Sequence, residues 1–298
     1  MSMEQWLPAP GERLRLMSVH AHPDDESSKG AATVARYSDE GVYNVLVCCT
    51  GGEEGDILNE EMNRPEVIEN LADVRRAELE KAVDVIGYET LLWLGYRDSG
   101  MKDSESNSHP DCFAAAPLDE AVTRLAVMIR SERPHVVMSY APSRGGYNHP
   151  DHERVHEITD PAIALAADPD AAIDGEPWQV TKLYFMTWAK ARILALHEQF
   201  LAHELESQYS QEWLDREGND HLITTKVSCG PWYQRRADAL LAHATQVDPN
   251  SKFWFGLPDN AAATAYPWED YERIWSHVDV PDDEDDLFAG LRVAAEAH

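Results

Sequence analysis

Short apolar runs alternate with amphipathic stretches along the first 140 residues of the chain. The apolar runs cover residues 14–19, 42–49, 91–94 and 135–140, and their length and composition are typical of buried strands. Between them, residues 31–41, 66–86 and 118–132 place apolar side chains at helical spacing, with Gly41 and Gly87 where C-terminal caps are expected. This alternation predicts an α/β fold with a mostly parallel sheet and helices on both faces.

The second half of the chain is less regular. We expect a strand at residues 181–188, a long helix at 189–216 and another helix at 231–247. The acidic run at 281–286 is typical of a solvated surface segment. Because no internal repeat and no Gly/Ser-rich linker interrupts the chain, residues 1–298 are expected to form one catalytic unit. Its core would span about residues 12–160, and about 161–298 would form a C-terminal elaboration around the substrate pocket.

Composition narrows the class of protein. Hydrophobic residues make up 43% of the 298 positions and charged residues 27%, which is typical of a globular chain. The net charge of −29 repels phosphate backbones, so we expect no nucleic-acid partner. No apolar run is long enough to cross a bilayer, so we expect no membrane partner. The N-terminus lacks a basic start followed by an apolar core, which favours a cytoplasmic protein. The oligomeric state stays open.

A dense group of chemically active side chains follows the first predicted strand. Residues 20–26 read HAHPDDE, which places His22, Asp24 and Asp25 at the carboxyl end of that strand. Pro23 stiffens the loop, and a stiff loop suits a metal site because ligand geometry must be held closely. Adjacent aspartates point in different directions, so one can bind a metal while the other faces water. The plainer alternative is a polar turn whose aspartate caps the next helix.

A second group, HPDH at residues 149–152, follows the strand predicted at 135–140. Ligands of parallel α/β sheets gather outside the carboxyl ends of the strands, so the two groups can meet in one cleft. From spacing alone, either His149 or His152 suits the role of a metal ligand. The four cysteines form no C-x-x-C pair, so a metal would rely on histidine and carboxylate ligands. The chain also lacks G-x-S-x-G and H-E-x-x-H, which disfavours a serine hydrolase and a common metalloprotease.

Together these motifs resemble the LmbE-like (PIG-L) family of N-acetylglucosaminyl deacetylases. The family consists of zinc hydrolases with a Rossmann-like sheet that remove acyl groups from amino sugars. The resemblance therefore implies that fold and amide hydrolysis for this chain. The matching pieces are AHPDDE at 21–26, TGGEEGD at 50–56, R-x-x-E at 75–78, LGYRDSG at 94–100, HPDH at 149–152 and AHATQ at 242–246.

The resemblance also implies a division of roles within the site. His22, Asp25 and His152 would hold Zn²⁺, and Fe²⁺ remains an alternative because the same ligands accept other divalent ions. Asp24 would be the general base that takes a proton from the attacking water. His149 would be the charged partner that stabilises the oxyanion and protonates the leaving amine.

Further residues match positions that the family uses around its substrate. The resemblance implies that Arg75 and Asp98 contact the sugar or inositol and that Tyr147 helps to bind substrate. Lys29 would contact the cysteinyl side of a conjugate, and Asp151 would hold His149 or support the site from behind the ligands.

Longer phrases resemble one branch of the family, the amidases of mycothiol S-conjugates. The phrases are HAHPDDESSKGAAT, TGGEEGDILN, GEPWQVTKLY and HATQVDPN. They imply a small-molecule thiol-sugar conjugate as partner, cleaved to glucosaminyl-inositol and an N-acetylcysteine S-conjugate in detoxification. The alternatives are the branch that deacetylates N-acetylglucosaminyl-inositol for mycothiol synthesis and a deacetylase of another sugar. A non-catalytic module that binds a sugar or a nucleotide is an alternative from another class. No G-x-G-x-x-G, the fingerprint of dinucleotide binding, follows the first strand.

Overall fold

A computed structural model of the chain describes residues 6–143, 147–258 and 260–292. Its strands form one seven-stranded sheet in the order β3-β2-β1-β4-β5-β7-β6. Strands β1 to β5 pair in parallel, whereas β7 is antiparallel to both β5 and β6. The strands are β1 (Arg15–His20), β2 (Tyr43–Thr50), β3 (Thr90–Tyr96), β4 (Val136–Tyr140), β5 (Lys182–Thr187), β6 (Thr225–Ser228) and β7 (Trp268–Ser276).

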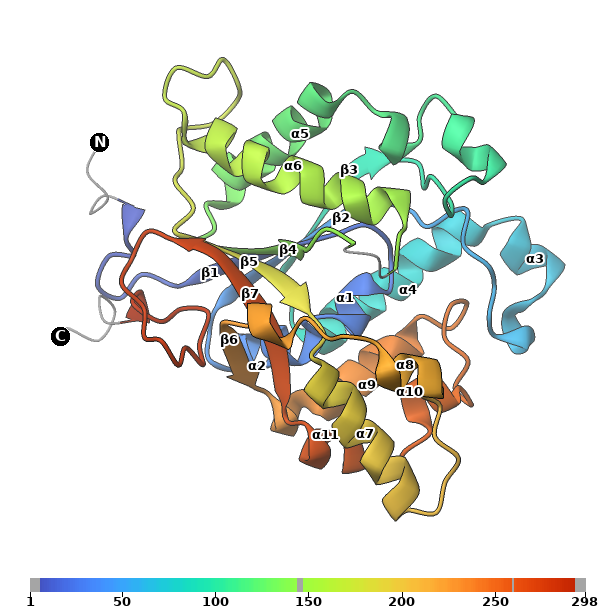
Figure 1. Cartoon of the computed structure of the whole chain (residues 1–298). Coiled ribbons are helices and arrows are strands. Elements are labelled where there is room, and N and C mark those ends of the chain that lie inside the picture. Colours follow the sequence, from blue (N-terminus) through green and yellow to red (C-terminus); the bar gives the residue numbers. More distant parts are fainter. Residues whose placement is uncertain (1–5, 144–146, 259, 293–298) are drawn as a thin grey trace.

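Helices cover both faces of the sheet, which confirms the predicted α/β class (Figure 1). Helices α5 and α6 lie side by side on one face, and α1, α2 and α4 lie on the other. The C-terminal helices α7 to α11 gather on the side of α2 and α4. The helices are α1 (Asp25–Ser28), α2 (Ala31–Asp39), α3 (Pro65–Ile68), α4 (Leu71–Ile86), α5 (Leu118–Glu132), α6 (Pro150–Ala167), α7 (Lys190–Ala202), α8 (Gln211–Asp215), α9 (Tyr233–Ala242), α10 (Lys252–Phe255) and α11 (Ala261–Ala265).

The strand order reverses between β1 and β4, at the centre of the sheet. Strands β1, β2 and β4 are buried almost throughout, because the sheet is covered on both faces and their apolar runs face helices on each side. At such a reversal the loops that follow the two strands diverge and leave a crevice at the carboxyl edge. The chain leaves the sheet at this point after His20 of β1 and after Tyr140 of β4, just before the first motif and ahead of the second.

Two helices predicted as continuous are interrupted in the structure. The predicted helix at 66–86 is α3 followed by α4, because the side-chain amide of Asn70 donates to the carbonyl of Glu66 at 2.9 Å and competes with helical pairing. The predicted helix at 189–216 ends at Ala202, since Glu204 adopts a left-handed φ of 57°. A separate short helix, α8, starts after Ser210, whose hydroxyl caps it by accepting from the backbone N–H of Trp213.

The prediction for the acidic run at 281–286 was wrong at Glu284. This carboxylate is 2% exposed and pairs with the equally buried Lys182 of β5 at 2.5 Å. Arg273 of β7 pairs with its second oxygen at 2.7 Å. The neighbouring Asp282, Asp283 and Asp285 are exposed, as expected of a surface segment. One glutamate of the run therefore fastens the tail to the sheet.

None of the described helices is both long and apolar enough to cross a membrane. Residues 1–5, on which the expectation about the N-terminus partly rests, lie outside the described residues.

Candidate metal centre and active site

The loop after β1 is folded tightly around its own aspartates. The backbone N–H of His22 donates to Asp25 Oδ2 at 3.0 Å, and the N–H of Asp25 returns a bond to the carbonyl of His22. Asp24 lies between them with φ 105°, a left-handed conformation that costs a non-glycine residue free energy. The strain turns neighbouring carboxylates to different sides, as the sequence predicts for adjacent aspartates.

Three side chains from the two motifs converge on one point. Potential ligand atoms of His22, Asp25 and His152 all lie within 4.8 Å of one another. His22 Nδ1 is 3.3 Å from Asp25 Oδ2, and His152 Nε2 is 3.2 Å from the same oxygen. Two imidazoles and one carboxylate are a donor set that suits a divalent transition-metal ion, with coordination positions left for water or substrate. The residues therefore fit the metal that the sequence predicts.

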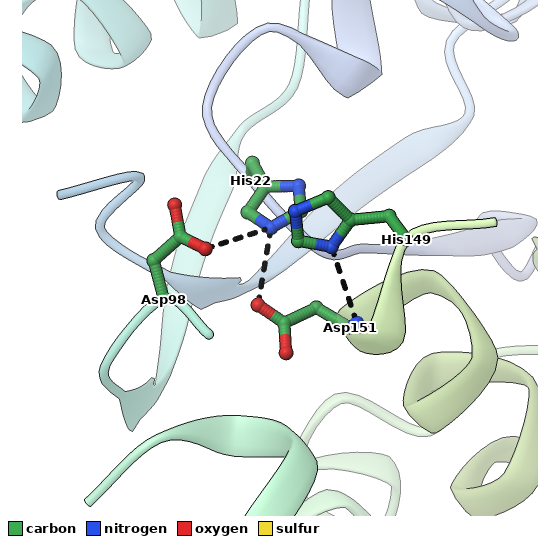
Figure 2. Close-up of side chains that lie close together, drawn as sticks. All are labelled: His22, Asp98, His149 and Asp151. Carbon is green, nitrogen blue, oxygen red and sulfur yellow. Dashed lines mark hydrogen bonds and ion pairs between the residues drawn. The ribbon is translucent and has the colours of Figure 1, made fainter. Parts of the chain in front are cut away.

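The second ring nitrogen of His22 is held by carboxylates from behind. His22 Nε2 lies 3.2 Å from Asp151 Oδ2 and 3.5 Å from an oxygen of Asp98 (Figure 2). Asp151 is fully buried and also accepts from the backbone N–H of Ser99 at 2.9 Å. A carboxylate on the far nitrogen fixes the tautomer and orientation of a metal-binding histidine and raises its basicity. Asp151 and Asp98 thus orient His22.

His149 lies beside His22 but is held differently. Its ring packs edge-on against His22, with 4.4 Å between centroids. The backbone N–H of Asp151 donates to His149 Nδ1 at 3.2 Å, so His149 caps the first turn of α6 (Figure 2). Nδ1 is therefore an acceptor, and the ring proton sits on Nε2. The side chain of Asp151 contacts His22, and its backbone N–H contacts His149.

The electrostatics of the cluster are those of a cation site. Burial acts to lower the pKa of His22, but hydrogen bonds with Asp151, Asp25 and Asp98 raise it well above its usual value. Burial and the nearby His22 lower the pKa of His149 to about 4. Burial opposes ionisation of Asp25, yet His152 and Lys29 hold its pKa well below its usual range. Three carboxylates around one imidazole favour positive charge at this point.

Asp24 is the carboxylate that stays off the cluster. Burial and the adjacent Asp25 raise the pKa of Asp24 to about 7. The side-chain amide of Gln246 donates to Asp24 Oδ2 at 2.8 Å and to the carbonyl of Pro23 at 2.7 Å. One oxygen of Asp24 is therefore fixed by Gln246, and the other is left for water or substrate.

The segment that follows α9, residues 243–246, contacts the first motif, and the sequence did not predict this contact. His243 and Glu26 are both fully buried and pair at 2.7 Å. Glu26 in turn accepts from the backbone N–H of Asp24 at 2.9 Å. Glu78 of α4 accepts from the hydroxyl of Thr245 at 2.6 Å. The phrase AHATQ at 242–246 was the available signal, but spacing alone does not say what it contacts.

Comparison with known proteins identifies the family. Residues 17–163 match the family model PIG-L, described as GlcNAc-PI de-N-acetylase. A mycothiol S-conjugate amidase of Streptomyces coelicolor is 43% identical over 292 residues, which cover 94% of this chain and 98% of that protein. The chain belongs to the PIG-L family. It is therefore a hydrolase of amide bonds, which speaks against the alternative of a non-catalytic sugar-binding module.

Other relatives carry a different activity in their names. The 1D-myo-inositol 2-acetamido-2-deoxy-alpha-D-glucopyranoside deacetylase of Thermobifida fusca is 40% identical and covers 78% of this chain and 83% of its own length. Among solved structures, the N,N'-diacetylchitobiose deacetylase of Pyrococcus horikoshii has a TM-score of 0.59 at 18% identity, over 87% of this chain and 83% of that one. At that identity the likeness shows the PIG-L fold alone.

A cavity of about 260 Å³ borders the cluster of His22, Asp25 and His152. Tyr147 stands at its exposed rim, 63% accessible, and Arg75 and Asp98 line it. Arg75 is only 1% exposed and donates to backbone carbonyls of Gly55 and Asp56 at 2.9 and 3.0 Å. Arg75 thus also holds the 51–56 loop. The predicted substrate contacts of Tyr147, Arg75 and Asp98 stay predictions.

Lys29 lies behind the cluster, where it contacts Asp25. Its ammonium group donates to Asp25 Oδ1 at 2.8 Å and leaves Oδ2 to the two histidines. It does not line the cavity above the cluster but a small adjoining one, which it shares with Trp188 and Arg192. Its predicted contact with the cysteinyl side of a conjugate therefore concerns this second opening, and it stays a prediction.

Proposed function

We propose that this chain hydrolyses the amide bond of mycothiol S-conjugates and releases glucosaminyl-inositol and an N-acetylcysteine S-conjugate. The observation that carries the proposal is the 43% identity to a mycothiol S-conjugate amidase across 98% of that relative's length. The similarity includes the C-terminal part of the chain, well beyond residues 17–163 that match the family model. We further propose that the part after about residue 160 completes the substrate pocket and that the enzyme works in the cytoplasm.

His22, Asp25 and His152 would hold Zn²⁺, with Fe²⁺ as the alternative in the cell. Bound there, the metal polarises the amide carbonyl and makes water more acidic. Asp151 and Asp98 keep the ring of His22 oriented for this task. Lys29 does the same for Asp25, because it occupies the oxygen that faces away from the histidines.

Asp24 is the general base. A carboxylate with a pKa near 7 both accepts a proton from the attacking water and gives it up again at neutral pH. The water oxygen attacks the carbonyl carbon while its proton passes to Asp24. When the C–N bond breaks, the same proton passes from Asp24 to the leaving amine. Gln246 holds Asp24 on the side of the cavity where these transfers take place.

His149 donates a hydrogen bond to the developing oxyanion through Nε2. The bond from the Asp151 backbone to Nδ1 places the proton on that atom. Because Nδ1 accepts that bond, the ring carries one proton in this arrangement, which supports this donor role rather than the charged, acidic role implied by the family resemblance. Loss of one such donor typically costs about two to three orders of magnitude in rate.

The second candidate is deacetylation of N-acetylglucosaminyl-inositol. Its support is the pair of relatives from Thermobifida fusca and Streptomyces scabiei, 40% and 37% identical, whose names describe that reaction. Both reactions cleave an amide on the same amino sugar, so the groups around the metal serve either one. The two candidates differ in the acyl group, which is acetyl in one and a substituted cysteinyl group in the other.

The deciding experiment compares hydrolysis of a fluorescent mycothiol S-conjugate and of N-acetylglucosaminyl-inositol by zinc-loaded enzyme. We expect the conjugate to have the higher kcat/KM. If the acetyl sugar is preferred, the biosynthetic deacetylase is the better assignment. Lys29→Ser then tests the contribution of Lys29, with the exposed Lys81→Gln of α4 as a control for loss of charge. An unchanged preference in Lys29→Ser would remove Lys29 from the specificity argument.

A further inference from the structure

A further cavity, distinct from the two described above, lies among the C-terminal helices, away from the metal cluster. It is bounded by α7, α9 and α10, which lie together on one side of the sheet (Figure 1). Its volume is about 80 Å³, several times the space that one water molecule needs. The walls include the aromatic rings of Trp188, Phe200, Tyr209, Tyr233, Phe253 and Trp254.

The polar lining of this cavity is cationic. Arg192, Arg236 and Lys252 line it, and no described aspartate or glutamate does. This is unusual for a chain with a net charge of −29. Arg192 is 6% and Arg236 8% exposed, so two guanidinium groups are withdrawn from solvent in one place. Buried charges are normally paired, because desolvation otherwise destabilises the charged form.

Neither arginine has a carboxylate partner within the described residues. Their side chains form no hydrogen bond or ion pair there, and Arg236 Nε is a buried donor without an acceptor. Both stack on the ring of Tyr233, at 5.9 Å for Arg192 and 6.0 Å for Arg236. Burial and the facing charge of Arg192 lower the pKa of Arg236. The stacking stabilises the planar groups but does not neutralise them.

Two acidic side chains, Glu269 and Asp270, line the smaller cavity beside Arg192, where both have other partners but Asp270 Oδ2 is buried without one. Glu269 accepts from the backbone N–H of Thr33 at 2.9 Å, and Asp270 pairs with Lys226 at 3.1 Å. Burial acts to lower the pKa of Arg192, but Tyr233 and the two carboxylates raise it overall. The carboxylates line only the smaller cavity that Arg192 shares with them, and not the one between the two arginines. Two forked donors without acceptors are the arrangement that binds a carboxylate with paired hydrogen bonds.

We propose that Arg192 and Arg236 form a binding site for a carboxylate carried on an aromatic ring. The guanidinium groups take the carboxylate, and the rings of Trp188, Phe253 and Trp254 take the aromatic part. The rings of Trp188 and Phe253 already stack, with 6.3 Å between their centroids and an angle of 16° between their planes. Flat aromatic walls around paired cations fit an aryl carboxylate better than an inorganic anion.

The site shares Trp188 and Arg192 with a smaller opening that Lys29 also lines. This opening has a volume of about 10 Å³, and the carboxylates Glu269 and Asp270 line it as well. Lys29 contacts the predicted metal ligand Asp25. If the chain has the proposed function, the expected source of the aryl carboxylate is the sulfur-linked group of a conjugate. A side chain must rotate to widen the opening, because it has room for about one water.

The first test measures direct binding of naphthalene-2-carboxylate to the zinc-loaded enzyme, with naphthalene-2-carboxamide as the neutral control. Calorimetry and quenching of tryptophan fluorescence are both suited, since Trp188 and Trp254 form the wall. We expect the acid to bind at least about 10-fold more tightly than the amide, and Arg236→Gln or Arg192→Gln to weaken it about 10- to 100-fold. Lys81→Gln removes the same charge from an exposed position and should leave binding unchanged.

Variant controls keep this outcome interpretable. Arg236→Lys keeps the charge but loses the planar fork, so its affinity should fall between wild type and Arg236→Gln. Acid bound at the metal instead would not respond to either arginine substitution. Equal affinity for acid and amide, or equal loss in Lys81→Gln, would overturn the proposal. So would full affinity in a folded Arg192→Gln/Arg236→Gln double variant.

The second test asks where the carboxylate comes from. Two mycothiol conjugates are compared, one with a carboxynaphthyl group on sulfur and one with its methyl ester. A higher kcat/KM for the acid, lost in Arg236→Gln, supports the substrate as source. If kcat/KM is equal for the two conjugates while naphthalene-2-carboxylate still binds, the conjugate is not the source of the carboxylate. The site then belongs to a separate aryl carboxylate. If neither conjugate is hydrolysed while binding persists, the proposed function fails and the binding site stands.

Discussion

At the scale of single residues, Asp24 has both a strained backbone conformation and a carboxyl group with a raised pKa. Its φ of 105° is rare for a residue with a side chain, and its pKa is raised to about 7. Strain of this kind persists only where surrounding contacts impose it. Here Glu26 holds the backbone N–H of Asp24, and Gln246 holds its side chain. The conformation separates the carboxylate of Asp24, the proposed base, from its neighbour Asp25, which faces the histidines.

Asp24→Asn therefore tests the base directly. We expect kcat to fall by about 10²- to 10⁴-fold, since an amide cannot accept the proton of water. Zinc content, measured by elemental analysis after dialysis, should stay at the wild-type level because Asp24 is not in the ligand cluster. The contrasting control is His152→Ala, which should lose both activity and zinc. Retention of more than about a tenth of kcat in Asp24→Asn would reassign the base.

His135 gives a prediction on pH that is independent of the metal. It precedes β4, at the opposite edge of the sheet from the cluster, and is fully buried. Burial, and then the charge of Arg15, lower the pKa of His135 to about 4. The unfolded state, with a pKa near 6.5, binds a proton first as the pH falls. His135 thus costs no stability above pH 6.5 and destabilises the fold progressively between pH 6.5 and 4, by up to about 3 kcal/mol.

Urea unfolding of metal-free enzyme from pH 7 to 4 measures this effect. His135→Gln should have a shallower loss of stability over that range than wild type. Carboxylates titrate in both proteins, so the difference between the two curves isolates His135. The exposed Asp111→Asn serves as a control that should leave the slope unchanged. Parallel curves for wild type and His135→Gln would contradict the assigned pKa.

At the scale of elements, the segment after α9 matters more than its length suggests. The helix predicted at 231–247 ends at Ala242, which frees His243 to pair with Glu26 and Gln246 to reach Asp24. These residues lie outside the part that matches the family model, residues 17–163. The loop that carries the proposed base is therefore positioned by contacts from a distant part of the chain.

Gln246→Leu removes both bonds to the loop while keeping similar volume. We expect kcat to fall about 10-fold with KM nearly unchanged, because Asp24 loses orientation and substrate binding does not depend on it. Gln234→Leu, at an exposed position of α9 where the amide contacts only Asp238, is the matched control. A rise in KM with constant kcat would instead make Gln246 a substrate contact.

The sequence predicts the central strands well because their apolar runs are continuous and buried on both faces. It misses β7, where the buried Glu269 and Asp270 hide the strand pattern. Their partners, Thr33 and Lys226, are distant in sequence, so local pattern cannot reveal that these carboxylates have partners inside the fold. For the same reason HPDDE and HPDH are recognisable as a site from sequence, whereas the roles of His243 and Gln246 emerge only from the fold.

At the scale of the whole molecule, one sheet joins both halves of the chain. The predicted metal ligands follow β1 and β4, and β5, β7 and β6 extend the same sheet with residues from the second half. Lys182 of β5 binds Glu284 and also donates to the carbonyl of Leu287 at 3.0 Å. The hydroxyl of Tyr184 donates to Glu284 as well, at 2.7 Å. This buried pair fastens the C-terminal tail beneath the sheet.

Lys182→Met should therefore destabilise the whole fold. Glu284 would lose its fully buried cation and keep only Arg273 as a charged partner, and breaking a buried pair typically costs about 3–5 kcal/mol. We expect a fall in Tm of roughly 6–15 °C for a chain of this size. The control is Lys252→Met, since that lysine pairs with Glu206 at an exposed position, where ion pairs contribute little. Equal Tm values for Lys182→Met and Lys252→Met would mean that the remaining partners of Glu284 suffice to hold the tail, and that the acidic run behaves after all as a surface segment.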